Sequence, residues 1–278
     1  MLTRKELKEL FLEYGFRPLK RYGENYLVDN NIKDKIIDEL DLSSGDRVLE
    51  IGPGLGALTL DIAESGAELT AVEKDRKACA ILAGLVGGDS KNATILNRDI
   101  LDYDITGFAG ERKIKIVGNL PYYITSPIIE KIIAAYAVTD FAVILVQKEF
   151  ANRLAAGPGS KEYGSLSCFV QYRAAISYIH TVKRTSFYPE PEVDSAIVRL
   201  DMLGKPPVDV RDEGLLFKVI RGAFNQRRKS LINSLSRKEV LDLPKDTLAE
   251  VFSRARVDPA TRPESMYLDD FARIVNSL

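Results

Sequence analysis

An α/β fold with a mostly parallel sheet is predicted for this chain of 278 residues by three observations. Short apolar runs alternate with segments of helical spacing from about residue 47 to 146. The first run ends in a glycine-rich turn, residues 52–56. Two further strand-like runs, 174–182 and 193–200, follow each other without a helical segment between them. The alternation predicts right-handed crossovers with helices on both faces, and the last two strands predict an antiparallel edge on a seven-stranded sheet.

The amino-terminal residues predict two helices separated by an irregular segment. Leu7, Leu10 and Phe11 have helical spacing within residues 3–13, and Gly15 ends that helix. Residues 17–29 lack periodicity. Asp29 or Asn30 caps a second helix that runs to about residue 40. The irregular segment is either a lid over a ligand or an ordinary loop.

The elements of the predicted sheet follow in order along the chain. Strands are expected at about 47–51, 68–72, 93–97, 114–118, 140–146, 174–182 and 193–200, and helices at about 56–65, 75–86 and 126–136.

The carboxyl-terminal part predicts a separate helical domain. Gly204-Lys205-Pro206-Pro207 is the best linker in the chain. Beyond it, the segments around 212–222, 228–236, 246–255 and 268–277 have helical patterns. We therefore expect two domains, 1–203 and 208–278.

Composition limits the class of protein. Hydrophobic residues make up 45% and charged residues 28% of the chain, as in an ordinary globular protein. Cys79 and Cys168 lie far apart, which argues against a disulfide framework and a zinc site. His180 is the only histidine, so a His-based metal cluster is excluded, and it lies in a predicted strand with no evident partner for a Ser-His triad. The amino terminus lacks a signal peptide and no apolar run has membrane-spanning length, so we expect a cytoplasmic protein without metal or membrane association.

The glycine-rich turn predicts a cofactor loop. Gly52, Gly54 and Gly56 follow the strand that ends at Ile51, where open α/β sheets bind ligands. Glu73 ends the next strand, and a carboxylate there suits two ribose hydroxyls. The spacing G-x-G-x-G differs from the dinucleotide fingerprint G-x-G-x-x-G and resembles that of class I S-adenosylmethionine-dependent methyltransferases. The alternative is a tight turn without a ligand.

Asp99 follows the third strand of the series. Its carboxylate is placed to accept a hydrogen bond from the exocyclic amine of an adenine. A lone aspartate at a strand end is more often a turn or cap residue. Together with Gly52 and Glu73, however, it completes a set at the ends of three successive strands.

Residues 118–123, Gly-Asn-Leu-Pro-Tyr-Tyr, predict the active site. The side-chain oxygen of Asn119 and the main-chain carbonyl of Leu120 can accept hydrogen bonds from an amine conjugated to an aromatic ring. That frees the nitrogen lone pair for attack on a methyl sulfonium. Pro121 stiffens the loop, and Tyr122 offers a face on which a base can stack. The alternative is a turn that packs a strand end.

Phe187 precedes a proline-rich loop between the two edge strands. With Tyr122 it would sandwich a base extruded from structured nucleic acid. A core phenylalanine that caps the sheet is the alternative.

A basic run extends from Arg221 to Lys238 without an acidic residue, although the net charge of the chain is −1. It includes Arg221, Arg227, Arg228 and Lys229. Such runs are usually solvated helix faces; binding to nucleic acid is the other interpretation.

Five motifs in this order resemble the ribosomal RNA adenine N6,N6-dimethyltransferase family, in its small-subunit (KsgA) type, from about residue 15 onward. They are Gly-Glu-Asn-Tyr-Leu, Glu-Ile-Gly-Pro-Gly-Leu-Gly-Ala-Leu-Thr, Glu-Lys-Asp, Asn-Leu-Pro-Tyr-Tyr and Phe-Tyr-Pro-Glu-Pro-Glu-Val-Asp-Ser-Ala. The segment 224–231 is also similar. The resemblance implies S-adenosylmethionine as the cofactor and two adjacent adenines near the 3′ end of small-subunit ribosomal RNA as the substrate, within a particle that precedes the 30S subunit.

The resemblance also implies roles for individual residues. Contacts with the cofactor are implied for Asn25, Leu27, Gly52, Gly54, Glu73, Asp99 and Asn119. Catalytic roles are implied for Asn119, Leu120, Tyr122 and Phe187, and phosphate contacts for the basic run. Position 24 is Glu where the family usually has Gln, which puts the role of Glu24 in doubt. We expect a monomer.

Three rival functions remain open. One is an antibiotic-resistance methyltransferase that acts on an adenine of large-subunit ribosomal RNA. The second is a DNA adenine methyltransferase, disfavoured because no separate target-recognition domain is predicted. The third is a non-catalytic RNA-binding or ribosome-assembly factor that retains the fold; Glu73, Asp99 and Asn119 argue against this as the sole role.

Overall fold

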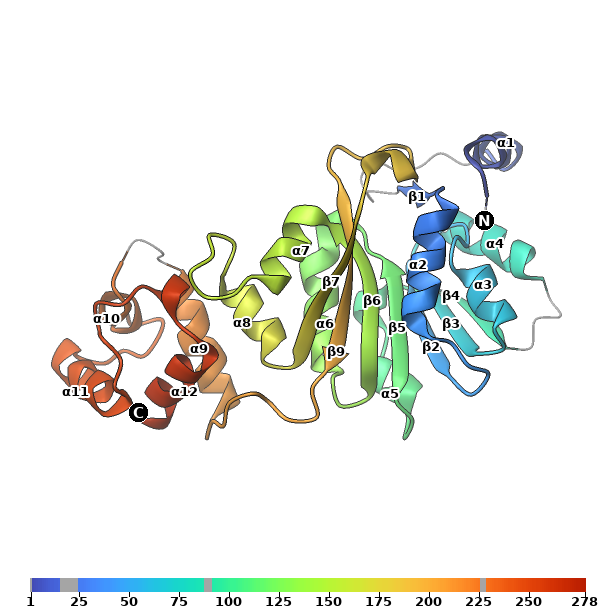
Figure 1. The fold of residues 1–278 in the computed structure, drawn as a ribbon. Coiled ribbons are helices and arrows are strands. Elements are labelled where there is room, and N and C mark those ends of the chain that lie inside the picture. Colours follow the sequence, from blue (N-terminus) through green and yellow to red (C-terminus); the bar gives the residue numbers. More distant parts are fainter. Residues whose placement is uncertain (1, 16–24, 88–91, 226–228) are drawn as a thin grey trace. The chain divides into compact units, whose positions relative to one another are not determined.

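The computed structural model describes residues 2–15, 25–87, 92–225 and 229–278 (Figure 1). The chain forms two compact units. The first comprises residues 1–151 and 175–202, and the second comprises 152–174 and 203–278. The segment 152–174, which the sequence placed in the first domain, is thus grouped with the carboxyl-terminal helices.

A seven-stranded sheet forms the centre of the first unit, in the order β4-β3-β2-β5-β6-β9-β7. Strands β4, β3, β2, β5 and β6 pair in parallel, and β9 pairs antiparallel with β6. This confirms the predicted mostly parallel sheet with an antiparallel edge. The strands are β2 (Arg47–Ile51), β3 (Glu68–Glu73), β4 (Ala93–Asn97), β5 (Ile114–Asn119), β6 (Thr139–Gln147), β7 (Ala174–Val182) and β9 (Ser195–Met202).

Helices cover the faces of this sheet, with α2 in front of it and α6 behind it in the view of Figure 1. Ile36 of α2 and Ile62 of α3 pack in one apolar cluster with Val48 and Val117 of the sheet. The side chain of Asp29 accepts a hydrogen bond from the N–H of Asn31 and begins α2, as predicted. The helices of this unit are α1 (Arg4–Glu13), α2 (Asn30–Leu40), α3 (Thr59–Glu64), α4 (Arg76–Val86), α5 (Ile105–Ala109), α6 (Thr125–Ala134) and α7 (Lys148–Ala155), which ends in the second unit.

The main differences between the structure and the sequence-based elements are of three kinds. Helix α3 begins at Thr59 rather than at 56, because Gly54 and Gly56 have φ of +57° and +86°, outside the helical region. The short helices α5, α7 and α8 (Ser165–Gln171) were not predicted. Neither was a two-stranded ribbon in which β1 (Tyr26–Leu27) pairs antiparallel with β8 (Phe187–Tyr188), because two-residue strands carry no period.

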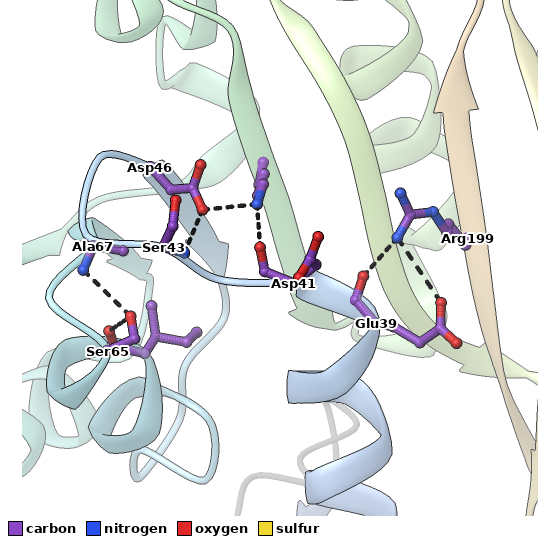
Figure 2. A network of polar contacts seen from close by, with 9 residues as sticks. Glu39, Asp41, Ser43, Asp46, Ser65, Ala67 and Arg199 are labelled. Carbon is purple, nitrogen blue, oxygen red and sulfur yellow. Dashed lines mark hydrogen bonds and ion pairs between the residues drawn. The ribbon is translucent and has the colours of Figure 1, made fainter.

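A network of hydrogen bonds connects the carboxyl end of α2 to the sheet where the parallel strands begin (Figure 2). Asp46, which precedes β2, accepts hydrogen bonds from the N–H of Ser43 and from Lys115 Nζ, each at 2.7 Å. Lys115 Nζ also donates to the main-chain oxygen of Asp41. Arg199 of β9 donates to the main-chain oxygen of Glu39 at 2.6 Å. These contacts hold the carboxyl end of α2 against the side of the sheet where the parallel strands begin, opposite to the glycine-rich turn.

The second unit is helical around its own apolar core. Tyr163, Tyr172, Phe252 and Phe271 are almost completely buried in it. The unit contains α8 (Ser165–Gln171), α9 (Glu213–Phe224), α10 (Leu231–Leu235), α11 (Lys245–Ala255) and α12 (Leu268–Asn276). Across the described parts of both units, every helix is too short or too polar to cross a membrane.

Candidate active site

A cavity lies where β2, β3, β4 and β5 end in the first unit. It encloses about 1100 Å³, including open solvent at its mouth. The strand order reverses between β2 and β5, and such switch points are where open α/β sheets bind ligands. The predicted residues that line the cavity are Asn25, Leu27, Gly52, Gly54, Glu73, Asp99, Asn119, Leu120 and Tyr122.

The glycine-rich turn needs its glycines for conformation and for space. Gly52 and Gly54 both have positive φ, +65° and +57°. A Cβ on Gly54 would lie 3.0 Å from the ring of Tyr26. Tyr26 of β1 therefore packs directly on the turn, and the amino-terminal segment forms one wall of the cavity.

Glu73 is held by main-chain donors. Its Oε2 accepts a hydrogen bond from the N–H of Gly54 at 3.0 Å, and its Oε1 accepts one from the N–H of Asp75 at 2.7 Å. Burial raises the pKa of this carboxyl, while these donors act in the opposite direction. Each oxygen has a further lone pair, so the carboxylate can still accept two ribose hydroxyls.

Asp99 has the capping role that the sequence offered as an alternative, and it also lines the cavity. Its Oδ1 accepts the N–H of Leu101 at 2.9 Å and caps a short 3₁₀ helix, residues 100–102. Its Oδ2 pairs with Lys74 Nζ at 2.6 Å. Burial acts to raise the pKa of Asp99, but the hydrogen bonds from Lys74 and Leu101 outweigh it, and the pKa is lowered. An ionised acceptor thus lines the cavity beside a cation that sequence reasoning missed.

Glu50 is a second residue that sequence reasoning missed. It lies within β2, is 2% exposed and lines the cavity. Its carboxyl accepts a hydrogen bond from Thr59 Oγ1 at 2.7 Å. Burial, with a contribution from nearby Glu73, raises the pKa of Glu50 to about 8. A carboxyl group inside the apolar run 47–51 was the signal that could have identified it.

Contacts from three directions fix the Asn119 loop. Asn119 Nδ2 donates to the main-chain oxygen of Asn25 at 2.9 Å, which leaves its Oδ1 as an acceptor. The N–H of Leu120 donates to the main-chain oxygen of Leu145 at 3.0 Å. Thr125 Oγ1 donates to the oxygen of Pro121 at 3.0 Å. The loop is therefore preorganised by the residue that precedes β1, by β6 and by α6.

Tyr122 presents a partly buried ring to the cavity. Its hydroxyl lies 2.7 Å from the Oγ of Ser195, the first residue of β9. Burial raises the pKa of Tyr122, so its hydroxyl stays protonated at neutral pH. The residue is thus suited to stacking and unsuited to act as a base.

Phe187 lies away from the cavity wall. Its ring is fully buried in the apolar cluster that contains Leu27 and Val182, and it is absent from the residues that line the cavity. The structure therefore places it in the core, and its implied stacking on a base stays a prediction that requires the ring to leave this cluster.

The basic run can be placed only in part. Arg221 on α9 and Lys229 after it are both exposed in the second unit. Arg227 and Arg228 lie outside the described residues, as does Glu24.

The hydrogen-bond acceptors and apolar side chains around the cavity fit S-adenosylmethionine. Glu73 suits a ribose diol, Asp99 suits the exocyclic amine of adenine, and the apolar side chains of Val72, Ala78 and Ile100 suit the face of a purine. No cluster of three potential metal ligands occurs among His, Cys, Asp and Glu of the described residues.

Curated relatives of this chain are named as ribosomal RNA methyltransferases. A relative from Lachnoclostridium phytofermentans, named ribosomal RNA small subunit methyltransferase A, is 41% identical over 276 residues, which cover 98% of this chain and 95% of the relative. A relative of the same name from Bacillus mycoides is 39% identical over 283 residues, covering 99% and 96%.

Two solved structures are similar over most of their length. A dimethyladenosine transferase from Plasmodium falciparum has a TM-score of 0.78 and 26% identity, covering 90% of this chain and 95% of that one. The 23S ribosomal RNA methyltransferase ErmE has a TM-score of 0.70 and 25% identity, covering 91% and 99%.

The family comparison covers nearly the whole chain. A model of the family described as ribosomal RNA adenine dimethylase matches residues 15–278. With the relatives above, it confirms the predicted class I methyltransferase fold and S-adenosylmethionine as the cofactor. The chain belongs to the ribosomal RNA adenine dimethylase family.

Proposed function

We propose that this protein transfers methyl groups from S-adenosylmethionine to N6 of two adjacent adenines near the 3′ end of small-subunit ribosomal RNA, giving N6,N6-dimethyladenosine. The observation that carries the proposal is the orientation of Asn119. Its amide nitrogen is engaged by the Asn25 carbonyl, so its oxygen and the Leu120 carbonyl are the acceptors available to an amine.

The reaction requires an amine that is more nucleophilic than a free adenine amine. The lone pair of N6 is delocalised into the ring, and two acceptors that bind its N–H groups in fixed positions favour a pyramidal nitrogen. S-adenosylmethionine supplies an electrophilic methyl group on sulfur. The nitrogen lone pair forms the new N–C bond, and the electrons of the broken C–S bond remain on sulfur. N6 then releases a proton to solvent, so no side chain is needed as a strong base.

The residues of the cavity contribute orientation rather than acid–base chemistry. Tyr122 holds the adenine by stacking, and the fixed loop 119–122 places the amine for in-line attack. Holding two reactants in the reactive geometry can supply about 7–11 kcal/mol of a barrier. The short distances around Asn119, Leu120 and Thr125 are the structural basis of that placement.

The proposed partner is ribosomal RNA within a particle that precedes the 30S subunit. Exposed Arg221 and Lys229, with Arg227 and Arg228, would contact phosphates, because cations dominate affinity for nucleic acid. We propose that the protein acts in the cytoplasm as a monomer.

A second candidate is methylation of an adenine in large-subunit ribosomal RNA. The similarity to ErmE over 91% of this chain favours it. The higher identity to the small-subunit enzymes, 41% against 25%, favours the first proposal.

The test is methyl transfer from labelled S-adenosylmethionine to unmethylated small and large ribosomal subunits, with nucleosides identified by mass spectrometry. N6,N6-dimethyladenosine in small-subunit RNA alone is the expected result. Label in the large subunit would assign the protein to the second candidate. Cofactor binding without transfer to either subunit would contradict both and support a non-catalytic assembly role.

A further inference from the structure

The contact between Tyr122 and Ser195 joins the active-site loop to the antiparallel edge of the sheet. The hydroxyl groups lie 2.7 Å apart, although 73 residues separate them in the chain. Ser195 is fully buried and lies opposite Gln147 of β6. It does not line the cavity, so any effect that it has on a bound base acts through Tyr122.

This contact restrains a different part of the loop from the other anchors. The hydrogen bonds of Leu120 and Thr125 fix main-chain positions. The Ser195 contact fixes the far end of the Tyr122 ring. A tyrosine held at its hydroxyl cannot change χ1 without losing that hydrogen bond, whereas rotation about χ2 leaves the hydroxyl oxygen in place because this atom lies on the rotation axis. The position of the ring on which a base stacks is therefore set by β9.

The two methyl transfers place unequal demands on that ring position. Before the first transfer the amine has two N–H groups for the two acceptors, the Asn119 side chain and the Leu120 carbonyl. After it, one N–H remains, and the amine carries a methyl group that must be turned away. One of two orienting hydrogen bonds is lost, so stacking on Tyr122 must supply more of the orientation in the second transfer.

We propose that Ser195 is a positioning residue which, through the hydroxyl of Tyr122, sets the rate of the second methyl transfer relative to the first. The proposal rests on the function proposed above and adds a determinant of the product, mono- or dimethyladenosine. Neither cofactor binding nor the two acceptors of the amine depends on Ser195, so this role is separate from theirs.

The experiment compares wild type, Ser195→Ala, Tyr122→Phe and the double variant in single-turnover methylation of small subunits. Mass spectrometry follows adenosine, N6-methyladenosine and N6,N6-dimethyladenosine, so both rate constants come from one time course. Since one hydrogen bond contributes about 0.5–1.5 kcal/mol, the second rate constant is expected to fall about tenfold and the first no more than about threefold. N6-methyladenosine then accumulates.

Three further results are expected if Ser195 acts through Tyr122. The double variant is no slower than either single variant, because both remove the same contact. Ser195→Thr, which retains the hydroxyl, restores the second transfer. The dissociation constant of S-adenosylmethionine stays unchanged in Ser195→Ala.

A matched control comes from β7, where Tyr178 and Thr181 form a similar hydroxyl pair at 2.8 Å. Neither residue lines the cavity. Tyr178→Phe and Thr181→Ala remove the same kind of hydrogen bond from the same unit, and the ratio of the two rate constants should stay at the wild-type value.

Equal loss of both rate constants, or multiplicative effects in the double variant, would overturn the proposal. If Ser195→Ala fails to fold, Tyr122→Phe removes the same hydrogen bond from the cavity side and decides the outcome alone. A wild-type protein that makes no dimethyladenosine would refute the proposed function, and the role of Ser195 with it.

Discussion

Charged side chains have different partners at the two ends of the parallel strands, which form two opposite edges of the central sheet. Where the parallel strands begin, charges pair with one another: Lys115 with Asp46, and Arg199 with Asp201, both at 2.7 Å (Figure 2 shows Asp46 and Arg199). Where the strands end, Asp99 pairs with Lys74, but Glu73 is held by main-chain N–H groups and Glu50 by the hydroxyl of Thr59.

We infer from this difference that the side chains where the strands begin stabilise the fold, whereas those where the strands end serve function. A carboxylate paired with a lysine has its charge neutralised within the protein. A buried carboxyl group held only by neutral donors keeps an unfavourable desolvation energy that a ligand with hydroxyl groups or positive charge can relieve. The edge that binds the cofactor is therefore expected to lower the stability of the free protein, and the opposite edge to raise it.

The largest expected effect is the pH dependence that Glu50 brings. Its pKa of about 8, against 4.5 for an ordinary glutamate, means that the folded protein retains a proton that the unfolded chain releases. Stability is therefore lost as pH rises from about 4.5 through 8. At about 1.4 kcal/mol per pH unit, the total is roughly 5 kcal/mol. Glu50→Gln should remove this loss, measured as the free energy of unfolding in urea at pH 5, 7 and 9.

Asp46 on the opposite edge should show the opposite sign. Burial acts to raise the pKa of Asp46, but Lys115 and Ser43 outweigh it, and the pKa is lowered. Its contribution to stability is present above the ordinary pKa of 3.8 and is lost as pH falls through the lower folded value. Asp46→Asn should therefore differ from wild type at neutral pH and converge on it in acid. For Glu50, the raised pKa would be contradicted if the free energies of unfolding of Glu50→Gln and wild type differed by the same amount at pH 5, 7 and 9.

The next effect concerns the two ends of β3. Glu73→Ala removes the acceptor for the N–H of Gly54 and the proposed acceptor for ribose hydroxyls. A hydrogen bond to a charged group contributes about 1.5–3 kcal/mol, so the dissociation constant of S-adenosylmethionine should rise about 10- to 100-fold in isothermal titration calorimetry.

Glu68 at the start of the same strand is the control. It pairs with Arg47 at 2.9 Å and with Arg112. Glu68→Ala should leave the dissociation constant of the cofactor unchanged. Equal weakening by both substitutions would show that the strand, rather than the carboxylate at its end, determines binding.

The smallest effect is expected from the paired charges. Lys115→Met removes the hydrogen bonds to Asp46 and Asp41. We expect a loss of about 1–2 kcal/mol in the free energy of unfolding, measured in urea at pH 7, with the cofactor dissociation constant unchanged. A change in cofactor affinity would mean that the two edges are coupled.

Sequence periodicity predicted the sheet well because its strands are long and apolar. The runs 47–51, 93–97 and 174–182 agree with β2, β4 and β7 residue for residue. The ribbon of Tyr26–Leu27 with Phe187–Tyr188 escaped prediction, since its pairing depends on residues about 160 positions apart. A contact between residues so far apart cannot be predicted from a local sequence pattern.

The site was predictable where a residue type stands at a strand end, as for Glu73, Asp99 and Asn119. It was not predictable where a residue acts through a tertiary contact. Ser195 reaches Tyr122 only because β9 lies beside β6, and the Asn25 carbonyl orients Asn119 only because β1 lies against the cavity. Burial, which places Phe187 in the core, likewise follows from packing and not from the local sequence.

The most direct measurement compares the two ends of β5, which carries Lys115 near its start and Asn119 at its end. Single-turnover methyl transfer would be measured for Asn119→Ala and Lys115→Met with saturating S-adenosylmethionine and small subunits. We predict that Asn119→Ala slows transfer at least about 100-fold while RNA binding persists, because it removes an acceptor fixed at the reacting amine, and that Lys115→Met transfers at the wild-type rate. Comparable transfer by the two variants, or loss of RNA binding by Asn119→Ala to the same degree as its loss of transfer, would contradict the account.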